Sequence, residues 1–215
     1  PLVYVLDGQN SFDGATSYTG TEWGFEEVAR ELEKQGKIPE AIYVGLDNGG
    51  HQRWYEYTFC PSNDGKYEGG GASLHMDFLC KEVDPFIRKH YRTKEKPAAL
   101  VGSSLGGLFG VYAALQYPEQ FSSIAALSPS VWWADRAILS LPKVPGKRTR
   151  LWIDVGTGEG ESRVKNLSAL YERLVLLGWQ PHHELRSLVV SGATHSEIAW
   201  ADRLNTVLLF IFENR

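Results

Sequence analysis

The chain alternates short apolar runs with longer amphipathic ones, and this alternation restricts the possible folds more than any other feature. Short apolar runs predict buried strands, and apolar residues at helical spacing predict helices that cover them. We expect strands at 2–6, 41–46, 98–101, 123–127, 150–155 and 184–190, and helices at 22–35, 73–90, 105–117, 162–177 and 197–212. Strands that alternate with helices favour an α/β fold, with a mostly parallel central sheet and helices on both faces.

Size and composition fit one domain. The chain has 215 residues, of which 43% are hydrophobic and 22% are charged, and no repeat or linker divides it. We therefore expect a single domain over residues 1–215. The net charge is −4 and no basic cluster stands out, which argues against a nucleic-acid partner. No apolar run approaches the roughly 20 residues that cross a bilayer, so no membrane partner is expected.

The first residue is Pro1, and the predicted strand 2–6 follows at once, without an initiator methionine or a signal peptide. We interpret the sequence as a fragment trimmed at its N-terminus. Its compartment cannot be read, with the cytoplasm slightly favoured. Cys60 and Cys80 are the only cysteines, which excludes a disulfide scaffold and a Cys-rich zinc site. The two thiols could pair or stay free.

A candidate nucleophile lies in the segment 102–106, Gly-Ser-Ser-Leu-Gly, between a predicted strand and a predicted helix. A serine on such a sharp turn has a strained backbone, and the flanking glycines remove side chains that would clash there. Ser104 would then project beyond the carboxyl end of its strand. The backbone N–H of Leu105, at the start of the helix, could donate to an oxyanion. The alternative is a helix start of small residues with Ser103 as its N-cap.

A serine nucleophile needs a general base, and His195 is the best-placed histidine. It follows the predicted strand 184–190, at the carboxyl edge of the sheet, where parallel sheets bind their ligands. The alternative is an exposed loop histidine. The other histidines lie before a strand, on a helix or in the long irregular segment 47–72: His51, His75, His90, His182 and His183.

An acidic residue that orients the histidine should follow the predicted strand 150–155. Asp154, Glu159 and Glu161 all qualify. Asp154 is still within the strand, where its side chain could tie down the loop instead. We favour Glu159, which lies on the loop, and a Ser–His pair without an acid stays open.

Several stretches resemble the esterase D-like branch of the α/β-hydrolases, the putative esterases. This branch includes S-formylglutathione hydrolases, feruloyl and acetyl-xylan esterases and enterochelin esterases. The serine turn is shared by the wider superfamily, whereas the Leu-Asp-Gly-Gln and Ser-Pro-Ser-x-Trp-Trp pieces are more specific. The stretches extend over nearly the whole chain: Tyr4-Val5-Leu6-Asp7-Gly8-Gln9-Asn10, Gly102-Ser103-Ser104-Leu105-Gly106-Gly107, Ser128-Pro129-Ser130-Val131-Trp132-Trp133 and Gly192-Ala193-Thr194-His195-Ser196-Glu197.

The resemblance implies an α/β-hydrolase fold with Ser104 as nucleophile and His195 as base. It also favours Glu159 as the acid, although most members carry Asp there. The family's oxyanion hole would correspond to the backbone amides of Leu105 and Gln9. Relatives usually have antiparallel strands before the first strand found here, so we expect either that these strands were cut away or that another segment supplies that sheet edge.

Aromatic residues near the expected site could bind the substrate. Trp132 and Trp133 follow a strand, and Trp54 and Tyr57 lie in the aromatic-rich segment 53–59. They could line an acyl pocket or stack on a ring. Packing within the core or within the loop is an equally good interpretation.

These observations predict a serine carboxylic-ester hydrolase that forms an acyl-enzyme on a small acyl, aryl or sugar ester. No metal or organic cofactor is implied, and the expected partner is a small-molecule ester. A homo-oligomer stays open. Two alternatives remain: an acyltransferase on the same scaffold, and a non-catalytic interaction module with a degenerate esterase site.

Overall fold

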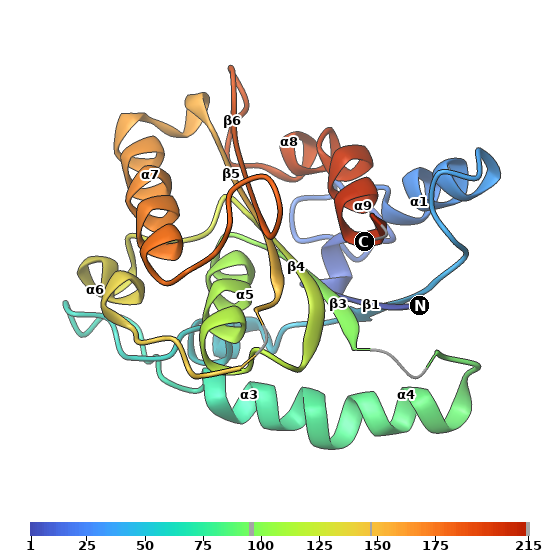
Figure 1. The fold of residues 1–215 in the computed structure, drawn as a ribbon, viewed down its shortest axis with the longest axis horizontal. Coiled ribbons are helices and arrows are strands. Elements are labelled where there is room, and N and C mark those ends of the chain that lie inside the picture. The colour runs from blue at the N-terminus through green and yellow to red at the C-terminus, as the bar shows by residue number, and fades with distance from the viewer. Residues whose placement is uncertain (95–96, 147, 214–215) are drawn as a thin grey trace.

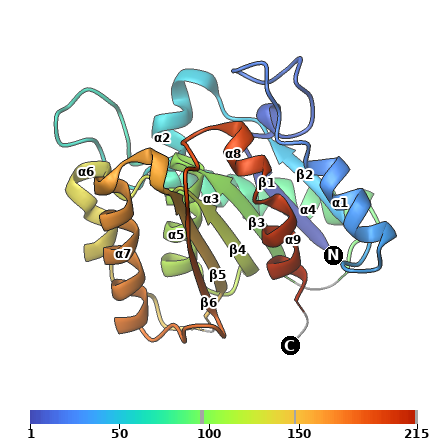
Figure 2. The ribbon, with the colours of Figure 1, turned by 90° about the horizontal axis from the view of Figure 1, so that it is seen from above.

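The computed structural model describes residues 1–94, 97–146 and 148–213, and within them it contains a six-stranded sheet between two layers of helices (Figures 1 and 2). The strand order is β2-β1-β3-β4-β5-β6, and every neighbouring pair is parallel. The parallel sheet predicted from the alternating pattern is confirmed. The strands are β1 (Leu2–Leu6), β2 (Ile42–Leu46), β3 (Ala98–Ser103), β4 (Phe121–Leu127), β5 (Arg150–Gly156) and β6 (Leu185–Val190).

Two hydrophobic clusters hold the helices on the sheet, one on each face. Helices α3, α4, α5 and α7 pack on the first face, and α1 and α9 pack on the second. The helices are α1 (Phe25–Lys34), α2 (Arg53–Tyr57), α3 (Ala72–Phe78), α4 (Asp84–His90), α5 (Leu105–Gln116), α6 (Trp133–Arg136), α7 (Glu161–Leu176), α8 (Glu197–Ala201) and α9 (Leu204–Phe212). In the described parts of the chain, none of these helices combines the length and the apolar character needed to cross a membrane.

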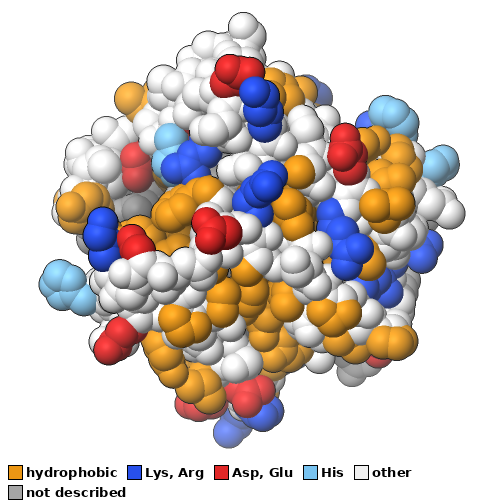
Figure 3. Space-filling view, turned by 90° about the vertical axis from the view of Figure 1, so that its left-hand side faces the viewer, with side chains coloured by type: hydrophobic (Ala, Val, Ile, Leu, Met, Phe, Trp, Pro, Cys, Tyr) orange, Lys and Arg blue, Asp and Glu red, His pale blue; other side chains and the backbone are white. Residues whose placement is uncertain are grey.

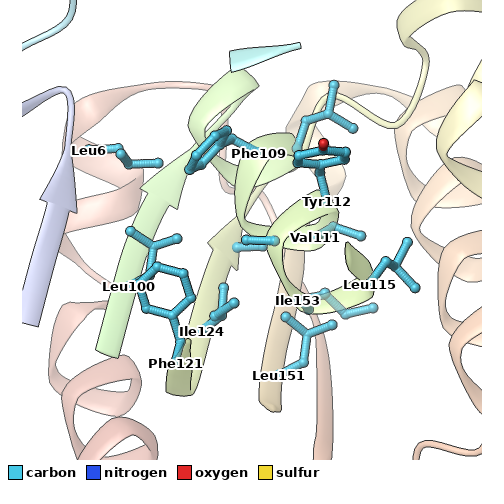
Figure 4. Packing of buried hydrophobic residues seen from close by; sticks show 14 of the residues in the cluster. Leu6, Leu100, Phe109, Val111, Tyr112, Leu115, Phe121, Ile124, Leu151 and Ile153 are labelled. Atoms are coloured by element: carbon cyan, nitrogen blue, oxygen red, sulfur yellow. The ribbon is translucent and has the colours of Figure 1, made fainter. Parts of the chain in front are cut away.

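Helix α5 lies at the centre of the first cluster, and Figure 4 shows it packed over β3, β4 and β5. Phe109 and Leu115 on the helix are buried, as are Leu100 and Ile124 on the strands below. Complete burial of one such side chain stabilises a fold by about 1.5–3 kcal/mol. The residue just before α5 is therefore held on a rigid base.

Two predicted helices are divided in the structure. The predicted helix 73–90 consists of α3 and α4 joined by a π-helical segment, Leu79–Val83, with Pro85 in the first turn of α4. Proline has no N–H for the bond to the preceding turn, and a wider turn accommodates this loss. The predicted helix 197–212 is α8 and α9, and the break contains Arg203, whose buried side chain reaches the sheet.

The segment 47–72 is less irregular than expected. It contains the short helix α2, which begins at Arg53 and includes Trp54 and Tyr57. A buried Tyr57 fixes this helix against the first cluster. The aromatic-rich part of the segment is therefore a packed element that lies beside the carboxyl end of β1.

Candidate active site

Ser104 lies on the sharp turn between β3 and α5, with φ 55° and ψ −117°. L-residues rarely adopt this conformation, and such strain is kept where the surroundings enforce it. Its N–H donates to the Leu127 carbonyl at 2.9 Å, and its carbonyl accepts from the Ser130 N–H at 2.9 Å. A side chain on Gly102 would lie 2.7 Å from the Gly106 backbone, so the turn requires glycine at position 102.

His195 brings its imidazole to this serine from the loop after β6. Its Nε2 lies 2.9 Å from Ser104 Oγ, and its Nδ1 lies 2.7 Å from Glu159 Oε2. Both distances are within hydrogen-bond reach, which a general base and the group that orients it must satisfy. With its proton on Nδ1, the neutral ring can accept the serine proton at Nε2 and donate to the carboxylate. The ring also packs edge-on against Trp200, with centroids 4.9 Å apart.

Glu159 is held rigidly on the loop after β5. Its side chain is only 2% exposed, and Oε1 accepts from Ser128 Oγ at 2.6 Å and from the Gly156 N–H at 2.8 Å. Burial raises the pKa of Glu159, but the hydrogen bonds from His195, Ser128 and Gly156 outweigh it and lower that pKa below its ordinary value. The group is therefore a carboxylate at neutral pH and can stabilise a protonated imidazole.

The other two candidate acids lie elsewhere. Asp154 is completely buried in β5, where Oδ1 lies 3.0 Å from Arg203 Nη1 and Oδ2 accepts from Trp152 Nε1 at 2.8 Å. Glu161 forms a surface pair with Lys165 at 2.7 Å. Of the three acids, it is Glu159 that contacts His195.

We expect Glu159→Gln to lower kcat by about 10³-fold, because the amide keeps the size of the carboxylate and removes the charge that stabilises the imidazolium. Steady-state hydrolysis of an activated ester measures this. The matched control is Glu161→Gln, on the same segment, with an expected change of no more than about twofold because surface substitutions away from a site have small effects. Retention of most activity by Glu159→Gln would instead indicate a Ser–His pair without an acid.

The two expected oxyanion donors lie on adjacent loops. Leu105 is the first residue of α5, directly after Ser104. Gln9 lies in the 3₁₀ turn Gly8–Asn10 after β1, and β1 pairs with β3 in the sheet. Amides on neighbouring strand ends can point at one oxygen, so the arrangement is compatible with the predicted hole.

The loop that carries Gln9 is fixed by a charged network that the sequence reasoning missed. Asp7, in a left-handed conformation with φ 56°, accepts from Arg53 Nε at 2.7 Å and Nη2 at 2.8 Å. Asn48 Nδ2 donates to the same carboxylate at 2.7 Å, and the backbone N–H of Asn48 donates to Gln9 Oε1 at 3.2 Å. The signal in the sequence was an aspartate immediately after a buried strand.

Ser128 is a second residue that the sequence reasoning left without a role. Its Oγ donates to Glu159, and it accepts from Trp200 Nε1 at 3.0 Å and Arg203 Nη2 at 3.4 Å. Its φ of 44° is again unusual for a residue with a side chain. Its place in the Ser-Pro-Ser stretch was the available signal. Through it, the buried pair of Arg203 and Asp154 supports the carboxylate that faces His195.

The four aromatic candidates have different environments. Trp132 is 36% exposed and lies close to Ser130, whose Oγ is 3.3 Å from Ser104 Oγ. Trp133 is 1% exposed and donates from Nε1 to the Cys60 carbonyl at 2.9 Å.

Trp54 stacks on Tyr67 and also packs on Trp133, with ring centroids 4.0 Å and 5.6 Å away. Tyr57 has no exposed surface, and its hydroxyl accepts from the Asp7 N–H at 3.2 Å. Burial gives Trp133 and Tyr57 packing roles. Contact with a substrate stays a prediction, and the exposed Trp132 carries it best.

Two cavities of about 440 Å³ lie away from the candidate site, and Ser104 and His195 line neither. The first lies at the amino ends of the strands, with Tyr4, Asp84 and Phe121 among its walls. The second lies between α7 and β6, with Tyr171 and Arg186 among its walls.

The chain belongs to the putative esterase family, whose model matches residues 1–211. A crystal structure of the BES protein from Bacillus cereus superposes with a TM-score of 0.77 at 25% identity, and the match covers 98% of this chain and 82% of that one. The expected α/β-hydrolase fold is thereby confirmed.

Two curated relatives show what members of the family do. The chain is 28% identical over 204 residues to the ferri-bacillibactin esterase of Bacillus subtilis, covering 84% of this chain and 68% of that protein. It is 26% identical over 194 residues to a diacylglycerol acyltransferase/mycolyltransferase of Mycobacterium intracellulare, covering 74% and 55%. The chain thus spans about two thirds or less of the length of the curated relatives it matches. The family supports ester hydrolysis as the general class of reaction.

Proposed function

We propose that the chain is a serine carboxylic-ester hydrolase that works through an acyl-enzyme. The observation that carries this proposal is the continuous contact from Ser104 Oγ to His195 at 2.9 Å and from His195 to Glu159 at 2.7 Å. A hydroxyl, a base and an orienting acid within hydrogen-bond reach are the requirements for an activated nucleophile. Three separate loops, after β3, β5 and β6, supply them.

In the proposed reaction, Ser104 Oγ attacks the ester carbonyl carbon while His195 Nε2 takes the hydroxyl proton. The carbonyl oxygen becomes an oxyanion, which the backbone N–H groups of Leu105 and Gln9 stabilise. The imidazolium then gives its proton to the departing alcohol, which leaves an acyl group on Ser104. Water, deprotonated by His195, releases the carboxylic acid by the reverse sequence and regenerates the serine.

We propose a small-molecule ester as the substrate, with siderophore esters as the first class to test. Support for this class comes from the named activity of the Bacillus subtilis relative. Aryl and sugar esters fit the exposed Trp132 equally well.

The family also contains an acyltransferase, and the same acyl-enzyme could pass its acyl group to an alcohol instead of water. One experiment separates the two outcomes. The protein is mixed with 4-nitrophenyl acetate, with and without glucose as acceptor, and the nitrophenol, acetate and acetyl-glucose are quantified. We expect acetate to account for the nitrophenol released in both mixtures.

Acetyl-glucose as the main product would identify a transferase. No release of nitrophenol, together with no turnover of a feruloyl ester, S-formylglutathione or a catecholate trilactone, would contradict the proposed function and favour a non-catalytic module.

A further inference from the structure

A cation stacked on an aromatic ring lies beside the candidate triad. The guanidinium carbon of Arg163 is 4.9 Å from the ring centroid of Trp132. Arg163 is in the first turn of α7, shortly after Glu159, and Trp132 closely follows Ser130, whose Oγ is 3.3 Å from Ser104 Oγ. The two members of the pair are therefore close along the chain to the proposed acid, Glu159, and to Ser130, which contacts the proposed nucleophile.

Arg163 has no ion-pair partner among the residues that the structure describes. Among the described residues, no carboxylate oxygen lies within 4.0 Å of its guanidinium nitrogens. The nearest acids along the chain are already occupied, since Glu159 faces His195 and Glu161 pairs with Lys165. Glu159 is only 2% exposed, so it offers no surface to a ligand.

The guanidinium is also partly withdrawn from water. Burial lowers the pKa of Arg163, and the charge of Glu159 only partly offsets this. A half-buried cation with no ion-pair partner in the described part of the chain is an unfavourable arrangement that a bound anion would relieve. Stacking on an indole restrains the guanidinium, so less entropy is lost when its N–H groups bind a planar oxyanion in bidentate fashion.

The surface around Arg163 is not a broad positively charged patch. Figure 3 shows the side of the molecule that carries α6 and α7, where Lys and Arg side chains are interspersed with Asp, Glu and hydrophobic ones. Attraction of an anion to this region would therefore be local to one guanidinium rather than the effect of a broad basic patch.

We propose that Arg163 and Trp132 form a specificity subsite for an anionic group of the ester substrate, such as a carboxylate attached to a planar or aromatic moiety. This inference rests on the proposed function, because it assigns a substrate class to the same site. The anion can belong to either half of the ester, the acyl group or the alcohol.

Two matched ester pairs test the subsite and show whether the acyl half or the alcohol half of the ester carries the anionic group. For the acyl half, 4-nitrophenyl hydrogen succinate is compared with its methyl ester. For the alcohol half, 4-acetoxybenzoate is compared with methyl 4-acetoxybenzoate. The quantity measured is the ratio of kcat/KM for the anionic ester to that for its neutral partner, in the wild type and in three variants: Arg163→Gln, Arg163→Lys and Lys165→Gln.

We expect Arg163→Gln to lower this ratio about 10- to 100-fold for one of the pairs, which is the usual worth of a hydrogen bond to a charged group. Arg163→Lys should retain part of the preference, since the charge remains and the planar fork is lost. Lys165→Gln removes an equal charge from the same helix at an exposed position and should leave the ratio unchanged. Equal effects of Arg163→Gln and Lys165→Gln, or no effect on either pair, would overturn the proposal.

Binding without turnover separates the subsite from the proposed function. In Ser104→Ala, calorimetric titration should show tighter binding of the preferred anionic ester than of its neutral partner, and adding Arg163→Gln should remove the difference. If this holds but the wild type hydrolyses no ester, the proposed function fails and the subsite stands. If esters are hydrolysed and the ratio does not depend on Arg163, the subsite fails and the proposed function stands.

Discussion

Ser104→Ala is expected to lower kcat for ester hydrolysis by about 10⁴-fold or more and to leave the unfolding transition close to that of the wild type. The substitution removes the one oxygen that His195 contacts at 2.9 Å. The backbone bonds that hold the turn, to Leu127 and Ser130, do not involve the side chain. Steady-state kinetics on 4-nitrophenyl acetate and thermal unfolding measure the two quantities.

The neighbouring serine gives a matched control. Ser103 is the last residue of β3 and is buried. Ser103→Ala makes the same chemical change, the loss of a serine hydroxyl, one position before Ser104. We expect this variant to keep most of its activity. Loss of activity in both variants to the same extent would indicate damage to the turn instead of removal of a nucleophile.

Asp154→Ala is expected to reduce the free energy of unfolding by about 3–5 kcal/mol, because it leaves the charge of Arg203 buried and uncompensated. Both side chains are almost inaccessible, at 0% exposed for the aspartate and 4% for the arginine. The substitution also removes the acceptor of Trp152 Nε1 and of the Ser128 N–H. Urea denaturation, analysed by linear extrapolation, measures the change.

The control for this prediction is Glu161→Ala, which breaks a pair of similar length on the surface. Exposed pairs contribute about 0–1 kcal/mol, so the control should unfold close to the wild-type midpoint. A loss below about 1 kcal/mol in Asp154→Ala would show that the buried pair does not stabilise the fold as its burial implies.

The layout of the fold was readable from the sequence because it depends on local patterns. Each predicted strand coincides with a strand of the sheet to within a few residues, since apolar runs of this short length, bounded by turn residues, favour buried strands. Ser104 and His195 were selected because parallel strands direct their carboxyl ends to one edge. Their contact also depends on the loop after β6, because β4 and β5 lie between β3 and β6 in the sheet.

The remaining features depend on contacts between distant segments. Asp154 lies near the end of β5 and Glu159 on the loop that follows it. Their roles differ because Arg203 reaches Asp154 from the break between α8 and α9. Trp132 and Trp133 are adjacent and look alike in sequence. Only Trp133 is buried, and its Nε1 donates to the Cys60 carbonyl. No local pattern encodes such partners, so the sequence left these choices open.

Covalent labelling tests the central claim most directly. The protein is treated with a fluorophosphonate, its intact mass is measured, and the modified residue is mapped by peptide mass spectrometry. The triad predicts addition of one phosphonyl group at Ser104, strongly slowed in His195→Ala because the hydroxyl then has no base to accept its proton. An unmodified protein, or a label at another residue, would contradict the proposal that Ser104 is the activated nucleophile.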